Sequence, residues 1–447
     1  MIHTCTMTIK RMTRRKNHSQ TGGIPIFAGA QGCVFRPSLK CKGRTRNYHD
    51  GNISKLGDMK SMEDELREYG QIKERLMRIK NHDEYFGMRA SMCQPDALDH
   101  HDLEKFDSVC INMNRLNITA ANVNANLSRL RMLNMPDLGI DLKKWMDQTA
   151  FDAPRIRQLN DHISTLLIHA VEPMNRLGVI HNDLKSENVM LDAAGNARII
   201  DWGLSGTSTE QHVIPPRHFM NNPVTFNRPF STMIISPNTC KLYESAVLSN
   251  ASDPPMEQIK HFTLEVYKRY NEAFDIDIYN YYQYTFMSIF GLSEKDAGEL
   301  LVRMVATYNA DILHHFTDRA NRTFRLNDYF STVYRYNTDV WGLMSVFYGM
   351  FMLPRKRFLM SDEAYEEMLR RYRRLFRTVI FANGDKRMNV SHIVQHLRHI
   401  NNAVSRLPKP KKTIRFNVGL KRNSTNHRNK SIKRVPTPYP HPAVFKK

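Results

Sequence analysis

Residues 181–188 contain an acid, a lysine and an amide at spacings suited to phosphoryl transfer, and a second acid follows at Asp201. Asp183 can accept the proton of an attacking hydroxyl or orient that hydroxyl. Lys185, two residues further on, can neutralise charge on the transferred phosphoryl group. Asn188 and Asp201 offer amide and carboxylate oxygens, which are hard ligands for Mg²⁺. The pattern therefore predicts transfer of phosphate from ATP with the help of Mg²⁺.

The chain between Asn188 and Asp201 predicts a tight hairpin that carries the two metal ligands. Residues 189–191 and 197–200 are strand-like, and they flank a turn-forming run at 192–196. A histidine next to an acid is common on protein surfaces and would mean little alone. The complete string of residues at these spacings is a specific signal.

A loop that covers the phosphates is predicted upstream, at residues 26–35. Gly29 and Gly32 let the backbone turn sharply and approach a phosphate closely, and Val34 follows on the next strand. Phe27 stands where such loops usually have their first glycine, so the match is partial.

A strand at residues 53–56 supplies the candidate lysine. Strand alternation puts Ile53 and Lys55 on one face, so Ile53 is expected to line an adenine pocket and Lys55 to contact phosphate. Lys40 is the competitor. It follows Gly32 by only eight residues, which leaves little room for two strands and a turn. Lys55 is therefore favoured.

Residues 60–78 predict a helix with one buried face, marked by apolar residues three and four apart. These residues are Met62, Leu66, Tyr69, Ile72 and Leu76. Glu65 falls on the same face and needs a partner, because an unpaired buried carboxylate is costly. Lys55 is the expected partner. If the helix is rotated slightly, Glu68 takes the place of Glu65.

Residues 130–135 predict a strand, followed by a turn and a helix from 140 to about 148. An adenine would pair with backbone groups around Asn134 and Met135. Because backbone makes those bonds, the side chains at these positions say little. The Met135 side chain is expected to fill core space.

Taken together, these motifs resemble those of protein kinases, with a catalytic loop at 181–188 and a metal-binding turn at 201–203. Three further blocks, at 29–41, 223–231 and 336–343, resemble a narrower family. That family is the divergent serine/threonine kinases of nucleocytoplasmic large DNA viruses, a group that contains iridoviruses, marseilleviruses and mimiviruses. The similarity extends over roughly residues 25 to 400.

The resemblance implies an α+β, bilobal fold, with a small β-rich N-lobe at 25–134 and a larger helical C-lobe at 135–405. It implies ATP and Mg²⁺ as cofactors and transfer to serine or threonine of protein substrates. It also implies that Asp339 braces the catalytic loop. The expected location is the host cytoplasm, at the viral factory, and the virion.

The sequence departs from the general kinase pattern in several places. Asn182 replaces the arginine that usually pairs with a phosphorylated loop, so no dependence on such phosphorylation is expected. Trp202 stands where the kinase pattern has a phenylalanine, and its bulkier apolar side chain is expected to pack in the same role. About 135 residues separate Gly203 from Asp339 without an A-P-E motif, which indicates an insertion at about 205–330. The insertion predicts three helices and one extended run, at 256–274, 276–290, 293–316 and 226–231 respectively.

Length and composition favour a large intracellular enzyme. The 447 residues can form two lobes with tails, and no apolar run is long enough for a membrane span. The basic N-terminus has no apolar core after it, so no signal peptide is expected. Six sparse cysteines predict free thiols in a reducing compartment. They are Cys5, Cys33, Cys41, Cys93, Cys110 and Cys240.

Positive charge is concentrated at the two ends of the chain. Residues 1–24 carry five Lys and Arg, and residues 408–447 carry twelve, without one acid in either segment. Of the formal net charge of +21, this leaves +4 for the body. Both ends, 1–24 and 406–447, are predicted to be disordered. The C-terminal tail is interpreted as a tether to nucleic acid or to an acidic protein, or as a solubilising segment without a partner.

Three classes of function remain open. The first is an active serine/threonine protein kinase. The second is a catalytically weak or inactive kinase fold that acts as a virion or scaffold protein. The third is a small-molecule phosphotransferase, which Lys185 argues against. Retention of Lys55, Asp183, Asn188 and Asp201 argues against the second class.

Overall fold

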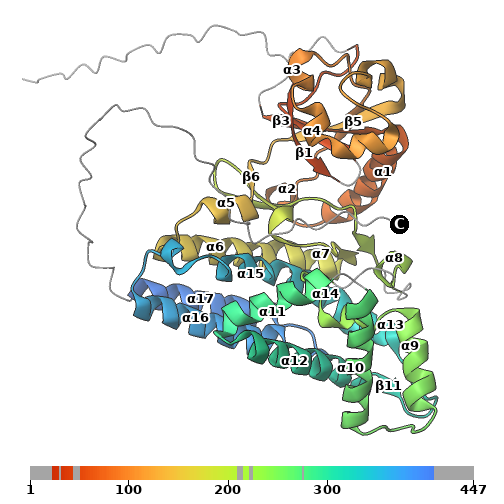
Figure 1. Ribbon diagram of the computed structural model, residues 1–447, viewed down its shortest axis with the longest axis vertical. Coiled ribbons are helices and arrows are strands. Elements are labelled where there is room, and N and C mark those ends of the chain that lie inside the picture. Colours follow the sequence, from red (N-terminus) through yellow and green to blue (C-terminus); the bar gives the residue numbers. More distant parts are fainter. Residues whose placement is uncertain are drawn as a thin grey trace, which may run out of the picture. The chain divides into compact units, whose positions relative to one another are not determined.

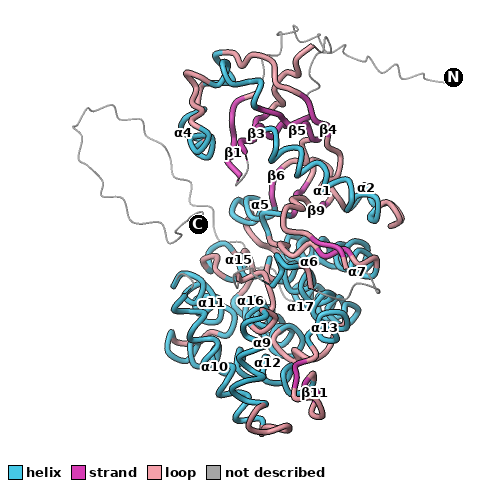
Figure 2. The backbone as a smooth tube through the Cα atoms, turned by 90° about the vertical axis from the view of Figure 1, so that its right-hand side faces the viewer, coloured by secondary structure: helices cyan, strands magenta, loops and turns pink. Residues whose placement is uncertain are grey.

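The structure is a computed structural model, and it describes residues 23–29, 32–43, 51–208, 215–220, 225–273 and 276–406. The chain divides into two compact units. Unit 1 comprises residues 1–67 and 89–137, and unit 2 comprises residues 68–88 and 138–447. The longer strands lie in unit 1, whereas unit 2 consists mostly of helices with several short strands (Figure 2). The segment 68–88, which the sequence placed with the N-lobe, groups with unit 2.

Unit 1 is built around a five-stranded antiparallel sheet with the order β1-β2-β3-β5-β4. The strands are β1 Ile24–Gly29, β2 Gly32–Arg36, β3 Asn52–Asp58, β4 Ser91–Cys93 and β5 Leu130–Pro136. Alternate residues of the inner strands are buried, as strand geometry requires. Phe35, Leu56 and Met132 are each fully buried and belong to one apolar core. The strands expected at 53–56 and 130–135 are thus present as β3 and β5, and the loop expected at 26–35 lies in the β1–β2 hairpin.

Short helices cover this core, and two disulfides fasten the segments that contain Cys110 and Cys41 to the sheet. The helices are α3 His100–Leu103, α4 Phe106–Val109, η1 Ile111–Leu116 and η2 Val123–Arg129. Cys33 on β2 bonds to Cys110, and Cys41 bonds to Cys93 on β4. The expectation of free thiols is therefore wrong for these four residues. Spacing along the chain could not reveal the pairs, because the sheet brings together cysteines that are 77 and 52 residues apart.

Helix α1, Met59–Leu76, has the buried face that its periodicity predicts. Met62, Ile72 and Leu76 are buried, whereas Glu63 and Glu68 are exposed. The helix is followed by α2, His82–Tyr85.

From residue 138 onward, unit 2 contains a small sheet and a long helical run that comprises α6, η3 and α7 (Figure 1). The elements before the insertion are β6 Ile140–Asp141, α5 Leu142–Gln148, α6 Ala153–Leu166, η3 Leu167–Val171, α7 Glu172–Arg176, β7 Val179–Ile180, η4 Ser186–Asn188, β8 Val189–Leu191, β9 Ala197–Ile199 and β10 Gly206–Thr207. Strands β8 and β9 form the predicted hairpin, and β8 also pairs with β6. Strand β10 pairs with β7. Gly178 is required beside this pair, because a Cβ there would lie 1.8 Å from the carbonyl oxygen of Ser208.

The insertion folds into a helical layer of unit 2. Its elements are α8 Arg217–Met220, η5 Phe230–Met233, α9 Pro237–Tyr243, η6 Glu244–Leu248, α10 Met256–Ala273, α11 Ile276–Phe290, α12 Glu294–His315, β11 Thr317–Asp318, β12 Thr323–Phe324, α13 Leu326–Tyr329 and η7 Phe330–Tyr334. The three predicted helices are present as α10, α11 and α12. Ser293 caps α12 by accepting a hydrogen bond from the backbone N–H of Asp296. The predicted extended run at 226–231 is wrong: these residues form a turn that leads into η5, closed by the Arg228 N–H to the Thr225 carbonyl.

The remaining helices follow the insertion in the chain and complete unit 2. They are α14 Arg335–Met344, α15 Val346–Phe351, η8 Arg355–Arg357, α16 Asp362–Leu375, η9 Phe376–Ile380 and α17 Val390–Arg406. Helices α16 and α17 lie side by side (Figure 1). Aromatic rings fill the interior, where Phe230, Trp341 and Phe381 lie with their centroids 4.9–5.7 Å apart. No helix among the described residues combines the length and the apolar composition that crossing a membrane requires.

Candidate active site

Asp339 on α14 fixes the loop that carries the predicted catalytic residues. Its Oδ2 accepts hydrogen bonds from the backbone N–H of His181 at 3.0 Å and from the side-chain amide of Asn175 at 2.7 Å. Its Oδ1 accepts from the backbone N–H of Asn182 at 2.8 Å. Burial raises the pKa of the Asp339 carboxyl above its ordinary value, although these donors oppose that shift. The bracing contact that the resemblance implied is thus present.

Asp183 is held as an ionised carboxylate by neighbours on the same loop and by Asn227 of the insertion. The Lys185 ammonium donates to its Oδ2 at 2.8 Å, and the Asn188 side-chain amide donates to the same oxygen at 3.1 Å. Burial would raise the pKa of Asp183. The charge of Lys185 and hydrogen bonds from Lys185 and Asn227 outweigh that effect and lower the pKa below its ordinary value. Asp183 can therefore accept a proton or a hydrogen bond from a hydroxyl.

The turn that contains Asp201 is fastened to the same loop. Asp201 is exposed and has a left-handed backbone, with φ of +65°, which is uncommon outside glycine. The N–H of the preceding Ile200 donates to the carbonyl of Asn188 at 3.0 Å. The His181 ring donates through Nε2 to the Ile200 carbonyl at 2.9 Å. Trp202 is buried against His181, with ring centroids 4.7 Å apart, so it packs as the expected apolar plug.

Asn188 and Asp201 have the donor chemistry that a Mg²⁺ ion needs. The Asn188 amide group donates to the carbonyl of Asp183 at 2.8 Å, which fixes the side chain and leaves its amide oxygen as a ligand. The Asp201 carboxylate is accessible to solvent. Within the described residues there is no group of three or more His, Cys, Asp or Glu that could hold a metal. A magnesium site for nucleotides does not require one, because Mg²⁺ usually takes one or two protein ligands together with phosphate and water.

Lys55 and Glu65 form the predicted ion pair within unit 1. The Lys55 ammonium contacts both carboxylate oxygens of Glu65, at 2.7 and 2.9 Å. The two side chains are only 17% and 14% exposed, so solvent screens this pair less than a surface pair. Ile53 is likewise partly exposed, whereas Ser54 between them is buried, as strand alternation predicts. Lys40, the competing lysine, is exposed.

The predicted glycine loop is described only at its two ends, since Ala30 and Gln31 lie outside the described residues. Gly29 pairs with Gly32 across the β1–β2 ladder. Gly32 also has a structural reason to be glycine: a Cβ there would lie 2.4 Å from the carbonyl oxygen of Leu56. Val34 follows on β2 in register with Lys55 on β3.

At the predicted hinge, Asn134 and Met135 differ in their surroundings. The Asn134 side-chain amide lies 3.2 and 3.4 Å from the sulfurs of Cys41 and Cys93 and is thus turned to that disulfide. The ladder between β5 and β4 ends at Asn134, which pairs with Ser91. Along the edge of β5 that faces β4, the backbone from Met135 onward is past the last paired residue. Met135 is therefore a better candidate than Asn134 for pairing with a base.

Two residues of the insertion reach the catalytic loop, and the sequence alone assigned them no role. The Asn227 side-chain amide donates to Asp183 Oδ1 at 2.9 Å and to the carbonyl of Leu184 at 3.1 Å. The Arg228 guanidinium donates through Nε to the carbonyl of Asn182 at 3.0 Å. Both belong to the block at 223–231, which carried a resemblance but no chemical signal by its spacing.

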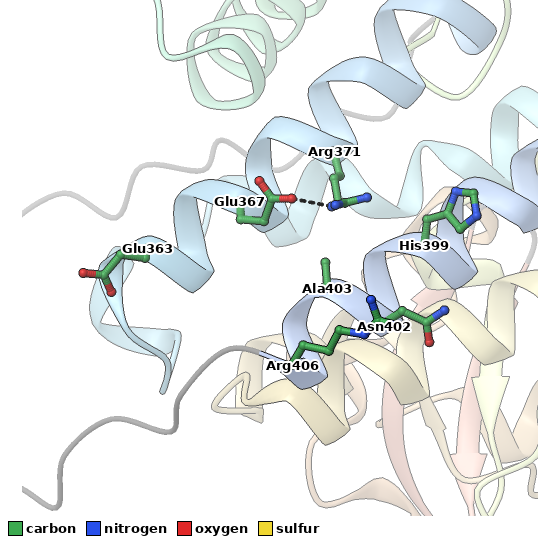
Figure 3. A pocket seen from close by; sticks show the side chains of 7 residues that line it. All are labelled: Glu363, Glu367, Arg371, His399, Asn402, Ala403 and Arg406. Carbon is green, nitrogen blue, oxygen red and sulfur yellow. Dashed lines mark hydrogen bonds and ion pairs between the residues drawn. The ribbon is translucent and has the colours of Figure 1, made fainter.

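A pocket of about 690 Å³ lies elsewhere in unit 2, on the surface of α16 and α17 (Figure 3). It is lined by Glu363, Glu367, Arg371, His399, Asn402, Ala403 and Arg406. Glu367 already accepts a hydrogen bond from Arg371 Nε at 2.6 Å, as Figure 3 shows. The lining includes none of the predicted catalytic or cofactor residues, and its charges are mixed. We therefore assign the pocket no part in catalysis.

Comparison with known proteins agrees with the phosphoryl-transfer chemistry that the geometry of this site indicates. Residues 133–225 match the protein kinase domain family. This segment includes the catalytic loop and the turn at Asp201. Together with the strand-rich unit 1 and the helical unit 2, the match is consistent with a kinase-like α+β fold.

Several serine/threonine kinases match short stretches of the chain. CBL-interacting serine/threonine-protein kinase 3 of Arabidopsis thaliana is 52% identical over 44 residues, which are 10% of this chain and 10% of that protein. The hormonally up-regulated neu tumor-associated kinase of Homo sapiens is 56% identical over 39 residues, 9% of this chain and 6% of that protein. CBL-interacting protein kinase 22 of Oryza sativa subsp. japonica is 38% identical over 64 residues, 14% and 13% respectively. The chain thus spans only a small part of these relatives, which support protein phosphorylation in general.

Proposed function

We propose that this protein transfers the γ-phosphoryl group of ATP to serine or threonine hydroxyls of protein substrates. The observation that carries the proposal is the arrangement around Asp183. An ionised carboxylate lies beside the Lys185 ammonium, and the Asn188 side chain is fixed by the same carboxylate. This arrangement pairs a hydrogen-bond acceptor for the attacking hydroxyl with a cation for the transferred phosphoryl group.

Each step of such a transfer has a candidate residue. Asp183 would accept the hydrogen bond of the acceptor hydroxyl and take its proton as the new P–O bond forms. Lys185 would stabilise negative charge on the phosphoryl oxygens. Lys55, oriented by Glu65, would bind a phosphate of ATP. Gly29, Gly32 and Val34 would cover the nucleotide, and Met135 would pair with its base.

Mg²⁺ would be held by Asn188 and Asp201. The ion neutralises charge on the phosphates to which it is bound. Asn188 suits this role because its amide nitrogen is engaged with Asp183, so its oxygen faces the other way. Asp201 suits it because its exposed carboxylate adds the negative charge that a divalent cation prefers.

A catalytically weak or inactive kinase fold is the second candidate function. The observation that favours it is the insertion, which packs Asn227 against Asp183, where an acceptor hydroxyl must also arrive. Incubation with labelled ATP, Mg²⁺ and a generic protein substrate decides between the two, with Asp183→Asn as the control. Transfer by the wild type and not by the variant supports the kinase. Tight binding of ATP without transfer supports the scaffold.

We also propose a viral origin, a location in the host cytoplasm or the virion, and a polyanionic partner for the basic ends. The first two follow from the resemblance of the blocks at 29–41, 223–231 and 336–343. The third follows from the seventeen Lys and Arg of the end segments, 1–24 and 408–447. Both of these segments lie outside the described residues except for Gly23 and Ile24, the first residue of β1.

A further inference from the structure

The insertion contributes a short turn that contacts the catalytic loop. In the span from Thr225 to Arg228, two side chains bond to three consecutive loop residues, namely Asn182, Asp183 and Leu184. The contacts join residues 43–46 positions apart in the chain. The turn is therefore part of the site by geometry, although it is remote from the catalytic loop in sequence.

Asn227 is the residue of this turn that touches the reacting carboxylate. Its Nδ2 donates to Asp183 Oδ1 at 2.9 Å, whereas Lys185 and Asn188 donate to the other oxygen, Oδ2. Both carboxylate oxygens are thus fixed, so the plane of the Asp183 side chain is defined. Without Asn227, the described donors would all lie at Oδ2 and the carboxylate could rotate about its last bond.

The orientation of the Asn227 amide is itself determined by its surroundings. The Thr225 hydroxyl donates to Asn227 Oδ1 at 2.8 Å, so the amide nitrogen must point to the catalytic loop. There it meets two acceptors, Asp183 Oδ1 and the carbonyl of Leu184. Asn227 is 3% exposed, which leaves water little access to replace these bonds.

The backbone of the turn is held rigidly by the body of unit 2. The Tyr282 hydroxyl lies 3.2–3.3 Å from three of its carbonyl oxygens, and Trp341 Nε1 donates to the carbonyl of Phe226 at 3.2 Å. Gly342 permits the close approach, because a Cβ there would lie 2.7 Å from the Leu184 carbonyl and 3.1 Å from the Asn227 carbonyl. The turn is a fixed support, suited to holding a catalytic group in place.

We infer that Asn227 is a positioning residue that holds the Asp183 carboxylate in the orientation needed to receive the acceptor hydroxyl. This inference rests on the proposed kinase function and names an additional residue for it. It assigns part of the insertion to the catalytic site. It also explains how the loop is held when Asn182 stands in place of an arginine: donors of the protein itself, Asn227 and Arg228, supply the contacts.

The test compares two substitutions that keep the size of the side chain. Asn227→Leu removes both polar atoms, and Asn227→Asp removes the donor and adds a negative charge beside Asp183. We expect kcat with MgATP and a peptide substrate to fall roughly 10- to 100-fold in Asn227→Leu, as for loss of a hydrogen bond to a charged group, and at least as far in Asn227→Asp. The KM for peptide and the Kd for MgATP should stay within about twofold.

Asn160→Leu is the matched control. Asn160 is also fully buried in unit 2 and bonds through its side chain to Asn401 and Tyr372, away from the catalytic loop. The Asn160→Leu variant should lose thermal stability without a selective loss of kcat. If Asn227→Leu does not fold, Asn227→Asp decides alone. Thr225→Val, which removes the donor that orients the amide, should cause a smaller loss in kcat than either.

Retention of kcat within twofold by a folded Asn227→Leu or Asn227→Asp variant overturns the inference. So does a loss in which kcat, KM, nucleotide affinity and melting temperature all change as they do in Asn160→Leu, since that pattern is only structural. Failure of the wild type to transfer phosphate is a separate result, because it rejects the proposed function before any variant is compared.

Discussion

At the scale of single residues, Asp183 is the clearest target, since three side-chain donors converge on its carboxylate. We expect Asp183→Asn to lower phosphate transfer by roughly 10²- to 10⁴-fold, the range for loss of a general base. Binding of MgATP should change little, because Asp183 is assigned to the hydroxyl and not to the nucleotide. Single-turnover transfer and nucleotide titration measure the two effects separately.

Asp147→Asn is a suitable control for that substitution. Asp147 lies on α5 in an exposed ion pair with Lys143 and loses the same charge. Near-normal transfer by this variant would show that the effect at Asp183 is local. Transfer by Asp183→Asn at the wild-type rate would remove Asp183 from the catalytic assignment.

Asp201→Asn should give a different pattern, because Asp201 is assigned to the metal. We expect the Kd for MgATP to rise by about 10- to 100-fold, the equivalent of about 1.5–3 kcal/mol for a contact to a charged group. Turnover should fall as well. Raising the Mg²⁺ concentration should recover part of the affinity, which a calorimetric titration at two Mg²⁺ concentrations can measure. An unchanged Kd would mean that Asp201 is not a ligand.

The sequence predicted those residues of the site that lie close together in the chain or follow the period of one strand or helix. Asp183, Lys185 and Asn188 lie within six positions, and Lys55 could be matched to Glu65 through the alternation of a strand and the period of a helix. Asn227 could not be found in this way. Its contact depends on the path of the insertion, and an asparagine two residues before a proline is typical of any turn.

At the scale of elements, periodicity predicted the long helices and missed the short turn. Helices α10, α11 and α12 lie close to their expected bounds because apolar residues recur at helical spacing. The run at 226–231 contains aromatic residues that favour strands. Here they are buried as ring contacts instead: the Phe230 ring packs edge-on to Trp341, and the backbone of the turn bonds to side chains. Tertiary contacts override a local preference of this size.

The disulfides of unit 1 lead to a prediction about its stability. Cys33–Cys110 and Cys41–Cys93 close segments of 77 and 52 residues, and loop entropy assigns each about 4 kcal/mol when it acts alone. We expect the double substitution Cys41→Ser with Cys93→Ser to lower the melting temperature by roughly 10 °C. Reduction of the wild type should lower it at least as far. Differential scanning calorimetry with and without a reductant provides the measurement.

Cys240→Ser is the matched control for the disulfide variant. Cys240 carries a free thiol, and burial raises its pKa to about 12, so it stays protonated and unreactive at neutral pH. Its substitution should leave the effect of reductant unchanged. If reductant does not alter the melting temperature of the wild type, the two disulfides do not stabilise unit 1.

At the scale of the whole molecule, the sequence predicted two parts with a single division between them. The expected division at residue 134 is close to the observed one at 137, because a strand ends there and a new helical segment begins. The segment 68–88 lies earlier in the chain and yet groups with unit 2. The reason is a set of contacts between residues far apart in the sequence. The Tyr69 hydroxyl donates to the Gly87 carbonyl at 3.0 Å, and the Gly87 N–H donates to the Ile199 carbonyl at 2.8 Å.

The basic end of the chain gives the last prediction. Residues 408–447 carry twelve Lys and Arg and no acid, and they follow α17, which ends at Arg406. We expect their removal to leave turnover of a small peptide unchanged, because every described residue of the candidate site lies before residue 340. Binding to duplex DNA should weaken, most strongly at low salt, because fewer condensed counterions are released.

The salt dependence gives this prediction its magnitude. If all twelve cations contact phosphates, deletion should reduce the slope of log K against log salt by up to about 11, at about 0.9 per contact. Electrophoretic or fluorescence titrations over a salt gradient measure that slope for the full-length and truncated proteins. An acidic protein partner would show a similar trend, so competition with free nucleic acid must accompany the titration. Equal retention of DNA by both proteins across the gradient would exclude the tail as a nucleic-acid tether.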